Sequence, residues 1–190
     1  MRSSADASPL ARSLAQAADD ILAAAPAVRG ELTVIVIDGR SGAGKTSLAR
    51  ELVARTRSAS LLMLDDIYPG WDGLAEATAV LATLLADVRA GRPGRWRAWD
   101  WDADDAAGER TIVPGEVLVV EGAGSLSPST ADAADVSVWL DAPAASRRDR
   151  ALRRDGDTYL PHWERWARQE DAHIARHAPR QLADIVIDLP

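Results

Sequence analysis

Residues 39–46 constrain the fold more than any other part of the chain, because they read G-R-S-G-A-G-K-T. In the spacing G-x-x-x-x-G-K-[ST], the glycines let backbone N–H groups turn inward around phosphate oxygens. A nearly all-apolar, β-branched run at 32–37 precedes the motif, and a helical stretch from 47 to about 57 follows it. A strand, a loop and a helix in this order favour a phosphate-binding loop over an ordinary Gly/Ser-rich turn.

The residue types within this loop predict how a nucleotide is held. Lys45, the only lysine of the chain, is expected to reach the β- and γ-phosphates, and the Thr46 hydroxyl is expected to ligate Mg²⁺. The following helix directs its positive N-terminal end at the same phosphates. The positions expected to bind the cofactor in this way are Gly39, Ser41, Gly42, Ala43, Gly44, Lys45, Thr46 and Ser47.

The rest of the chain alternates short apolar runs with helical patterns. Strands are predicted at 32–37, 61–64, 117–120, 136–140 and 185–187, and helices at 9–25, 47–57, 74–88, 143–155 and 161–178, with an irregular excursion or hairpin at 91–115. This alternation predicts an α/β fold, a doubly wound, mainly parallel five-stranded sheet with helices on both faces. We expect residues 1–190 to form one domain with its core at about 31–190.

Acidic residues follow the predicted strands, and parallel strands bring their carboxyl ends to one edge of the sheet. Asp65 and Asp66 end the second strand, close to where a γ-phosphate would lie, and a carboxylate there can accept the proton of an attacking hydroxyl. The alternative for this pair is an acidic loop cap. Glu121 ends the third strand and can hold Mg²⁺, although Glu121-Gly122 can also be simple turn chemistry.

An arginine-rich segment at about 143–157 predicts a second anion-binding element. Arg147, Arg150 and Arg154 lie at i, i+3 and i+7 and therefore share one helical face. Guanidinium groups suit the charge spread over a transferring phosphoryl group. A solvated helix with ion pairs to Asp149 and Asp155 is the alternative.

Composition excludes several classes of function. The chain has no Cys, which excludes disulfides, thiolate metal sites and a cysteine nucleophile, and its net charge of −7 argues against nucleic acid or an anionic membrane as the main partner. Asn is also absent, which removes the guanine-reading Asn-Lys-x-Asp motif of typical GTPases. The N-terminal residues fit neither a secretory signal nor a membrane span, so a cytoplasmic location is expected.

Five of the seven tryptophans gather in two stretches. Trp163 and Trp166 form a stripe with Glu170, His173 and His177 at helical spacing, for which core packing is the default and a pocket wall the alternative. Glu170 would be costly in a core without a partner. In the other stretch, Trp96, Trp99 and Trp101 flank Asp100, and flat aromatic side chains beside a carboxylate can hold a ring and its hydroxyls.

The order of these motifs resembles the uridine kinase and phosphoribulokinase branch of P-loop kinases. The resemblance spans about residues 32–157 and rests, beyond the phosphate loop, on Asp65-Asp66-Ile67-Tyr68, Trp99-Asp100-Trp101, Val119-Val120-Glu121-Gly122, and Asp141 followed by Arg147, Arg150, Arg154 and Asp155. It implies that Asp65 is the catalytic base and that the three arginines belong to a lid. It also implies that Tyr68, Trp71, Trp99, Asp100 and Trp101 face the phosphate acceptor.

Two departures from the family pattern bear on the acceptor. Ile67 replaces the family's Phe, and the nucleoside-binding insert after Tyr68 is shortened to residues 69–72. These departures count against uridine itself. The aromatic residues and Asp100 favour a small neutral or cationic hydroxyl compound as the acceptor, with nucleosides as the leading class.

The sequence thus predicts an enzyme that moves the γ-phosphate of Mg-ATP to a small-molecule hydroxyl, with Lys45, Asp65, Arg147 and Arg150 as catalytic residues, Arg154 at the nucleotide, and Thr46 and Glu121 at the metal. The alternatives are a phosphohydrolase, in which Asp65 would position water, and a nucleotide-binding regulatory module. ADP formation that depends on an acceptor separates the kinase from both. A homodimer is left open.

Overall fold

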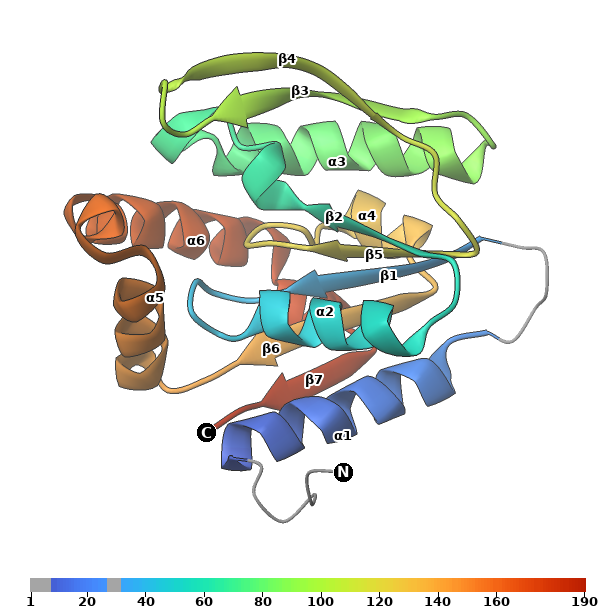
Figure 1. Cartoon of the computed structure of the whole chain (residues 1–190), viewed down its shortest axis with the longest axis horizontal. Helices are drawn as coiled ribbons and strands as arrows, with labels where there is room; N and C mark the ends of the chain where they lie inside the picture. The colour runs from blue at the N-terminus through green and yellow to red at the C-terminus, as the bar shows by residue number, and fades with distance from the viewer. Residues whose placement is uncertain (1–7, 27–31) are drawn as a thin grey trace.

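Five parallel strands form the central sheet of the computed structural model, which describes residues 8–26 and 32–190. They are β1 (Thr33–Asp38), β2 (Ala59–Met63), β5 (Val117–Glu121), β6 (Val136–Asp141) and β7 (Ile185–Asp188). Their order is β2-β5-β1-β6-β7, and every neighbouring pair is parallel (Figure 1). The predicted sheet is confirmed. Position 31, where the predicted core begins, and residues 1–7 lie outside the described residues.

Helices cover both faces of this sheet (Figure 1). α1 (Pro9–Ala24) and α2 (Lys45–Arg55) lie on one face, and α3 (Leu74–Arg89), α4 (Pro128–Ala133) and α6 (Trp163–His177) lie on the other. β1 contributes to both cores, because successive side chains of a strand point to opposite faces. Ile35 and Ile37 pack with α1 and α2, while Val34 and Val36 pack on the side of α3.

The N-terminal helix α1 begins as predicted. The Ser8 Oγ accepts the N–H of Ala11 at 3.1 Å, and Pro9 occupies the first turn, where its missing N–H costs no helical hydrogen bond. Ala17, Ala18 and Ile21 are buried against the sheet side of α1. No helix within the described residues is both long and apolar enough to cross a membrane.

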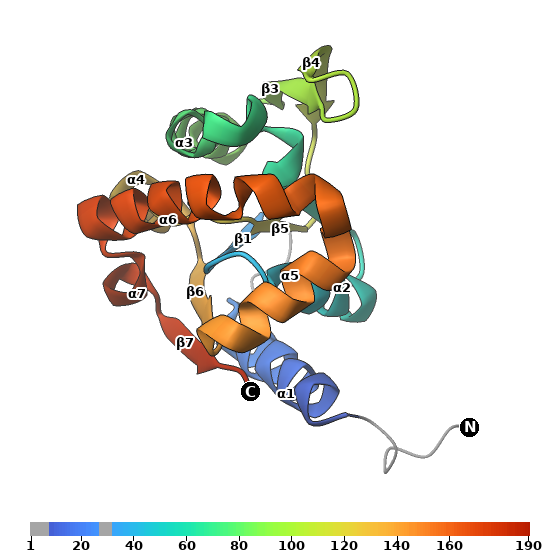
Figure 2. The ribbon, with the colours of Figure 1, turned by 90° about the vertical axis from the view of Figure 1, so that its left-hand side faces the viewer.

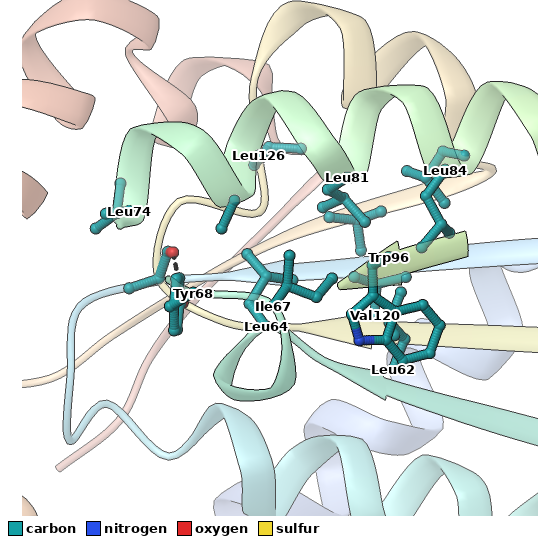
Figure 3. Packing of buried hydrophobic residues seen from close by; sticks show 14 of the residues in the cluster. Leu62, Leu64, Ile67, Tyr68, Leu74, Leu81, Leu84, Trp96, Val120 and Leu126 are labelled. Carbon is teal, nitrogen blue, oxygen red and sulfur yellow. Dashed lines mark hydrogen bonds between the residues drawn. The ribbon is translucent and has the colours of Figure 1, made fainter. Parts of the chain in front are cut away.

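The segment after α3 is a β-hairpin, which settles the two options for residues 91–115. β3 (Gly94–Asp100) pairs antiparallel with β4 (Asp105–Ile112), and the hairpin lies beside α3 (Figure 2). A Cβ at Gly94 would lie 2.7 Å from the Leu84 Cγ, so glycine lets the hairpin approach α3 closely. Trp96 of β3 lies near Leu62, Leu81 and Leu84 in the core beneath α3 (Figure 3).

The elements that carry the candidate site residues lie at the carboxyl edge of the sheet. Figure 2 looks onto this edge, with α5 (Ala144–Tyr159) and α6 in front of the loop that joins β1 to α2. α5 is kinked at Gly156, which has φ 57° and ψ −135°. The shorter elements are η2 (Leu64–Asp66), η3 (Gly70–Asp72), η4 (Leu160–His162) and α7 (Pro179–Leu182).

Candidate active site

A cavity of about 650 Å³ opens at the carboxyl edge of the sheet, within the range of small-molecule sites. Residues from the phosphate loop, from the ends of β2 and β5, and from α5 and α6 surround it. Its lining residues are Ser41, Gly42, Gly44, Lys45, Thr46, Ser47, Arg50, Met63, Asp65, Tyr68, Trp71, Trp101, Glu121, Gly122, Ala123, Arg150, Ala151, Arg154, Asp155, Thr158, Tyr159 and Trp166.

The phosphate loop has the backbone geometry that its glycines predict. Gly42 has φ +75°, and a Cβ there would lie 2.0 Å from the Arg147 carbonyl oxygen. A Cβ at Gly39 would lie 2.1 Å from the Leu140 carbonyl oxygen. α2 begins at Lys45 with no side-chain cap, which leaves its first N–H groups directed at the cavity mouth, where an anion is favoured.

Lys45 lies along this loop, and only 8% of it is exposed. Its Nζ donates hydrogen bonds to the Gly39 carbonyl at 2.7 Å and to the Arg40 carbonyl at 3.1 Å. The ammonium group is therefore held beside the loop and still lines the cavity. A buried cation at this place can neutralise phosphate charge in a low-dielectric site.

Thr46 and Glu121 meet at the base of the cavity. The Thr46 Oγ1 donates to the Glu121 Oε1 at 2.9 Å, and Glu121 is 3% exposed at the end of β5. Burial raises the pKa of Glu121, and the nearby Lys45 opposes that rise. Two side-chain oxygens fit Mg²⁺, which takes hard oxygen ligands and completes its shell with water and substrate phosphates.

Asp65 and Asp66 are both exposed, but Asp65 lines the cavity and Asp66 lies outside its lining. The 3₁₀ turn of η2 holds Asp65, with the Tyr68 N–H donating to the Leu64 carbonyl at 3.0 Å. The cavity walls displace bulk water and raise the pKa of Asp65 from its ordinary value, while Arg154 and Lys45 lower it. Asp65 is thus the member of the pair that can reach a bound molecule.

An aromatic cluster (Tyr68, Trp71, Trp101, Tyr159 and Trp166) lines the cavity beside Asp65. Trp71 stacks on Tyr159, with ring centroids 5.4 Å apart, and meets Trp101 edge to face at 5.0 Å. Tyr68 meets Trp166 edge to face at 4.7 Å. The Trp101 Nε1 donates to the Asp65 carbonyl at 2.9 Å, so the cluster also fixes the turn that carries Asp65.

Two residues predicted at the acceptor lie outside this lining. The Asp100 Oδ1 accepts the N–H groups of Asp102 and Ala103, both at 3.0 Å, in the turn of the hairpin. Trp99 packs beside Gly70, where an added Cβ would lie 3.3 Å from the Trp99 Cζ2. The structure therefore brings Tyr68, Trp71 and Trp101 to Asp65 and leaves Trp99 and Asp100 apart.

The three predicted lid arginines have different surroundings. Arg154 lines the cavity and forms a bidentate pair with Asp155, at 2.8 and 2.7 Å. Arg150 also lines it, but its Nε donates to the Gly42 carbonyl at 2.8 Å. Arg147 lies outside the lining and donates to the Ser41 carbonyl at 3.3 Å. Arg147 and Arg150 thus hold carbonyl groups of the phosphate loop.

Several lining residues were missed by sequence reasoning. Arg50 of α2 and Tyr159 of α5 carry no pattern that separates them from other helical residues. Core packing and a pocket wall are the two alternatives for the tryptophan stripe, and Trp166 fits both, because it is 5% exposed and lines the cavity. Glu170 of the same stripe lies outside the lining, and its carboxylate accepts the Ser41 N–H at 2.7 Å.

Comparison with known proteins found no matching family model and no match among curated proteins. Solved structures do match. A possible uridine kinase from Bacillus stearothermophilus superposes with a TM-score of 0.62 and 19% identity, over 93% of this chain and 98% of that one.

A candidate fructose transport system kinase from Silicibacter sp. superposes with a TM-score of 0.60 and 18% identity, over 91% of this chain and 98% of that one. This chain has the P-loop kinase fold. The resemblance drawn from the sequence motifs is confirmed at the level of the fold.

Proposed function

We propose that this chain is a kinase that transfers the γ-phosphate of Mg-ATP to a hydroxyl group of a small molecule. The observation that carries the proposal is one cavity in which Lys45, the Thr46–Glu121 pair and Asp65 face the same space. A phosphate loop alone supports any nucleotide-binding function. A cavity-facing carboxylate beside an aromatic wall is what a kinase needs for an acceptor.

Different residues of the cavity bind the phosphates, hold the metal and stabilise the transferring group. Backbone N–H groups of the phosphate loop and the Lys45 ammonium bind the β- and γ-phosphates. Thr46 and Glu121 would hold Mg²⁺, which supplies charge neutralisation on the phosphates when it is bound. Arg154, which lines the cavity, would stabilise the charge of the transferring group.

Asp65 acts on the acceptor. Its carboxylate orients the acceptor hydroxyl and accepts its proton, while a bond forms between the acceptor oxygen and the γ-phosphorus and the bond between that phosphorus and the β,γ-bridging oxygen breaks. The products are ADP and the phosphorylated acceptor. The raised pKa of Asp65 makes it a better proton acceptor than an ordinary aspartate, provided it is ionised.

The aromatic cluster favours an acceptor with a flat or sugar-like ring. Nucleosides remain the first class to test, and sugars follow because one structural neighbour is a candidate fructose transport system kinase. A small molecule is proposed as the main partner, in the cytoplasm, rather than nucleic acid or a membrane. The net charge of −7 supports this choice.

The proposal is tested by ADP release with Mg-ATP across a panel of nucleosides, sugars, vitamins and nucleoside monophosphates. The expected result is that one class raises ADP formation well above the rate without acceptor, and that Lys45→Ala removes the rise. Turnover that no acceptor stimulates favours the phosphohydrolase. Nucleotide binding without turnover favours the regulatory module.

A further inference from the structure

The backbone N–H and the carbonyl of Ser41 are each bound by a side chain from a different helix outside the phosphate loop. The Glu170 Oε1 of α6 accepts the Ser41 N–H at 2.7 Å, and the Arg147 Nη1 of α5 donates to the Ser41 carbonyl at 3.3 Å. The Glu170 Oε2 lies 3.5 Å from the Arg40 Nη1, and Arg40 also pairs with Asp171. The backbone N–H and the carbonyl of Ser41 are therefore both occupied before any nucleotide is bound.

Glu170 is unusual because its carboxylate is buried. Only 5% of the residue is exposed, and a buried carboxylate is costly unless hydrogen bonds and a nearby cation compensate. Here the Ser41 N–H and the Arg40 guanidinium supply both. A hydrogen bond from an N–H to an ionised carboxylate is about twice as strong as one between neutral groups.

The helix that carries Glu170 is itself fastened at several points. The His173 Nε2, one turn further along, lies 3.0 Å from the Leu126 carbonyl and 3.3 Å from the Asp38 Oδ2. The Gln169 Nε2 donates to the Trp71 carbonyl at 2.6 Å. α6 is thus tied to the end of β1, to the loop after β5 and to the acceptor side of the cavity. Glu170 projects from a rigid support.

The loop that Glu170 contacts needs such support. Glycine-rich backbone loses more conformational entropy on ordering than other backbone, and Gly39, Gly42 and Gly44 all have positive φ. If that cost is met when the protein folds, it does not weaken ligand binding. The other N–H groups of the loop are then already ordered when phosphates arrive.

We infer that Glu170 is a positioning residue for the nucleotide: it fixes the Ser41 peptide and so holds the phosphate loop ready for the phosphates. This inference rests on the proposed binding of nucleotide at the loop. Glu170 touches no reacting atom, and its effect reaches the phosphates through the loop backbone.

The test measures the dissociation constant of Mg-ADP by calorimetry for the wild type, Glu170→Ala, Glu170→Gln and Asp171→Asn. Asp171 is the matched control, because it lies on the same helix and pairs with the same arginine but is 63% exposed. Glu170→Ala is expected to weaken Mg-ADP binding about 10-fold or more, because a loop without this hydrogen bond must be ordered at the expense of ligand binding. Asp171→Asn is expected to bind as the wild type does.

Steady-state kinetics separate positioning from general damage. Glu170→Ala is expected to raise KM for ATP by a similar factor while KM for the acceptor stays within about threefold. Glu170→Gln keeps an oxygen at the same reach for the Ser41 N–H, so it is expected to recover most of the affinity. A loss of fold alone would lower both affinities together, and thermal unfolding of each variant monitors it.

If Glu170→Ala does not fold, Mg-ADP binding by Glu170→Gln and Glu170→Asp tests the inference. Glu170→Gln retains the reach and loses the charge, whereas Glu170→Asp retains the charge and loses the reach. Tighter Mg-ADP binding by Glu170→Gln than by Glu170→Asp supports the inference, and the reverse order overturns it. Equal binding by folded Glu170→Ala and wild type also overturns it. A wild type that does not bind Mg-ADP refutes the proposed function instead.

Discussion

The phosphate end of the cavity is formed by one continuous segment, whereas the acceptor end is assembled from residues far apart in the chain. Six residues between positions 41 and 47 line the phosphate end. The aromatic cluster combines η3, the end of the hairpin, α5 and α6. Phosphates are held by backbone geometry, which a local glycine pattern encodes, while an acceptor is held by side chains that only the tertiary fold brings together.

The largest effect is expected at Asp65, where the phosphate end and the acceptor end of the cavity meet. Asp65→Asn is expected to lower kcat by about 10²- to 10⁴-fold, because the amide cannot accept the hydroxyl proton. The dissociation constant of Mg-ADP should change by less than about threefold, since Asp65 acts on the acceptor and not on the phosphates. Steady-state kinetics and calorimetry measure the two quantities.

Asp66→Asn is the control for that variant, because Asp66 is the adjacent carboxylate and lies outside the cavity lining. We expect its kcat to remain close to that of the wild type. If Asp66→Asn lost the activity and Asp65→Asn kept it, the base would be Asp66 and the assignment of the turn would be wrong.

The phosphate end is tested by Lys45→Ala. The expected loss of kcat is about 100-fold or more, because the buried ammonium neutralises phosphate charge in the transition state. The fold should persist, since the hydrogen bonds of the Lys45 Nζ go only to the Gly39 and Arg40 carbonyls of the loop. Near-normal kcat in a variant with an unchanged unfolding temperature would refute the role of the loop.

The acceptor end is tested by comparing Trp101→Ala with Asp100→Ala. Trp101 lines the cavity, so its truncation is expected to raise KM for the acceptor about 10-fold with little change in KM for ATP. Asp100 caps the hairpin turn, so its truncation is expected to change KM for the acceptor by less than about threefold. A larger effect at Asp100 would return it to the acceptor site, where the family resemblance places it.

The smallest expected effect is a shift in the pH profile. The pKa of Asp65 is raised from 3.8 by burial, so its carboxylate takes up a proton at a higher pH than an ordinary aspartate. Activity needs the ionised form, and kcat/KM should therefore decline as the pH falls through this raised pKa. The profile is measured at saturating Mg²⁺, because the pKa of Glu121 is raised as well. Full activity down to about pH 4 would contradict the assignment.

The same contrast explains how far the sequence could predict the structure. The five strands, the loop and the meeting of Asp65 with Glu121 follow from local patterns and from the rule that parallel strands end at one edge. The contacts of Asp100 with its own hairpin turn and of Arg147 with the Ser41 carbonyl depend on tertiary placement. Helical spacing put Arg147, Arg150 and Arg154 on one face, but it could not tell which of them faces the cavity.

For Glu170, the sequence indicates that a buried carboxylate needs a partner but does not identify that partner. Its charge within an aromatic stripe indicated a missing partner, but nothing local identified that partner as the Ser41 N–H, 129 positions away. Long-range partners of this kind join the two ends of the cavity, because α6 carries Trp166 at the acceptor end and Glu170 at the loop.

Whether the two ends of the cavity serve one transfer reaction is measured by following the γ-phosphate of labelled ATP in the presence of an acceptor that stimulates ADP release. The kinase account predicts that the label appears on the acceptor in equal amount to the ADP formed, with little free phosphate, and that Asp65→Asn abolishes this transfer. Label found only as inorganic phosphate, at the same rate with and without acceptor, would contradict it.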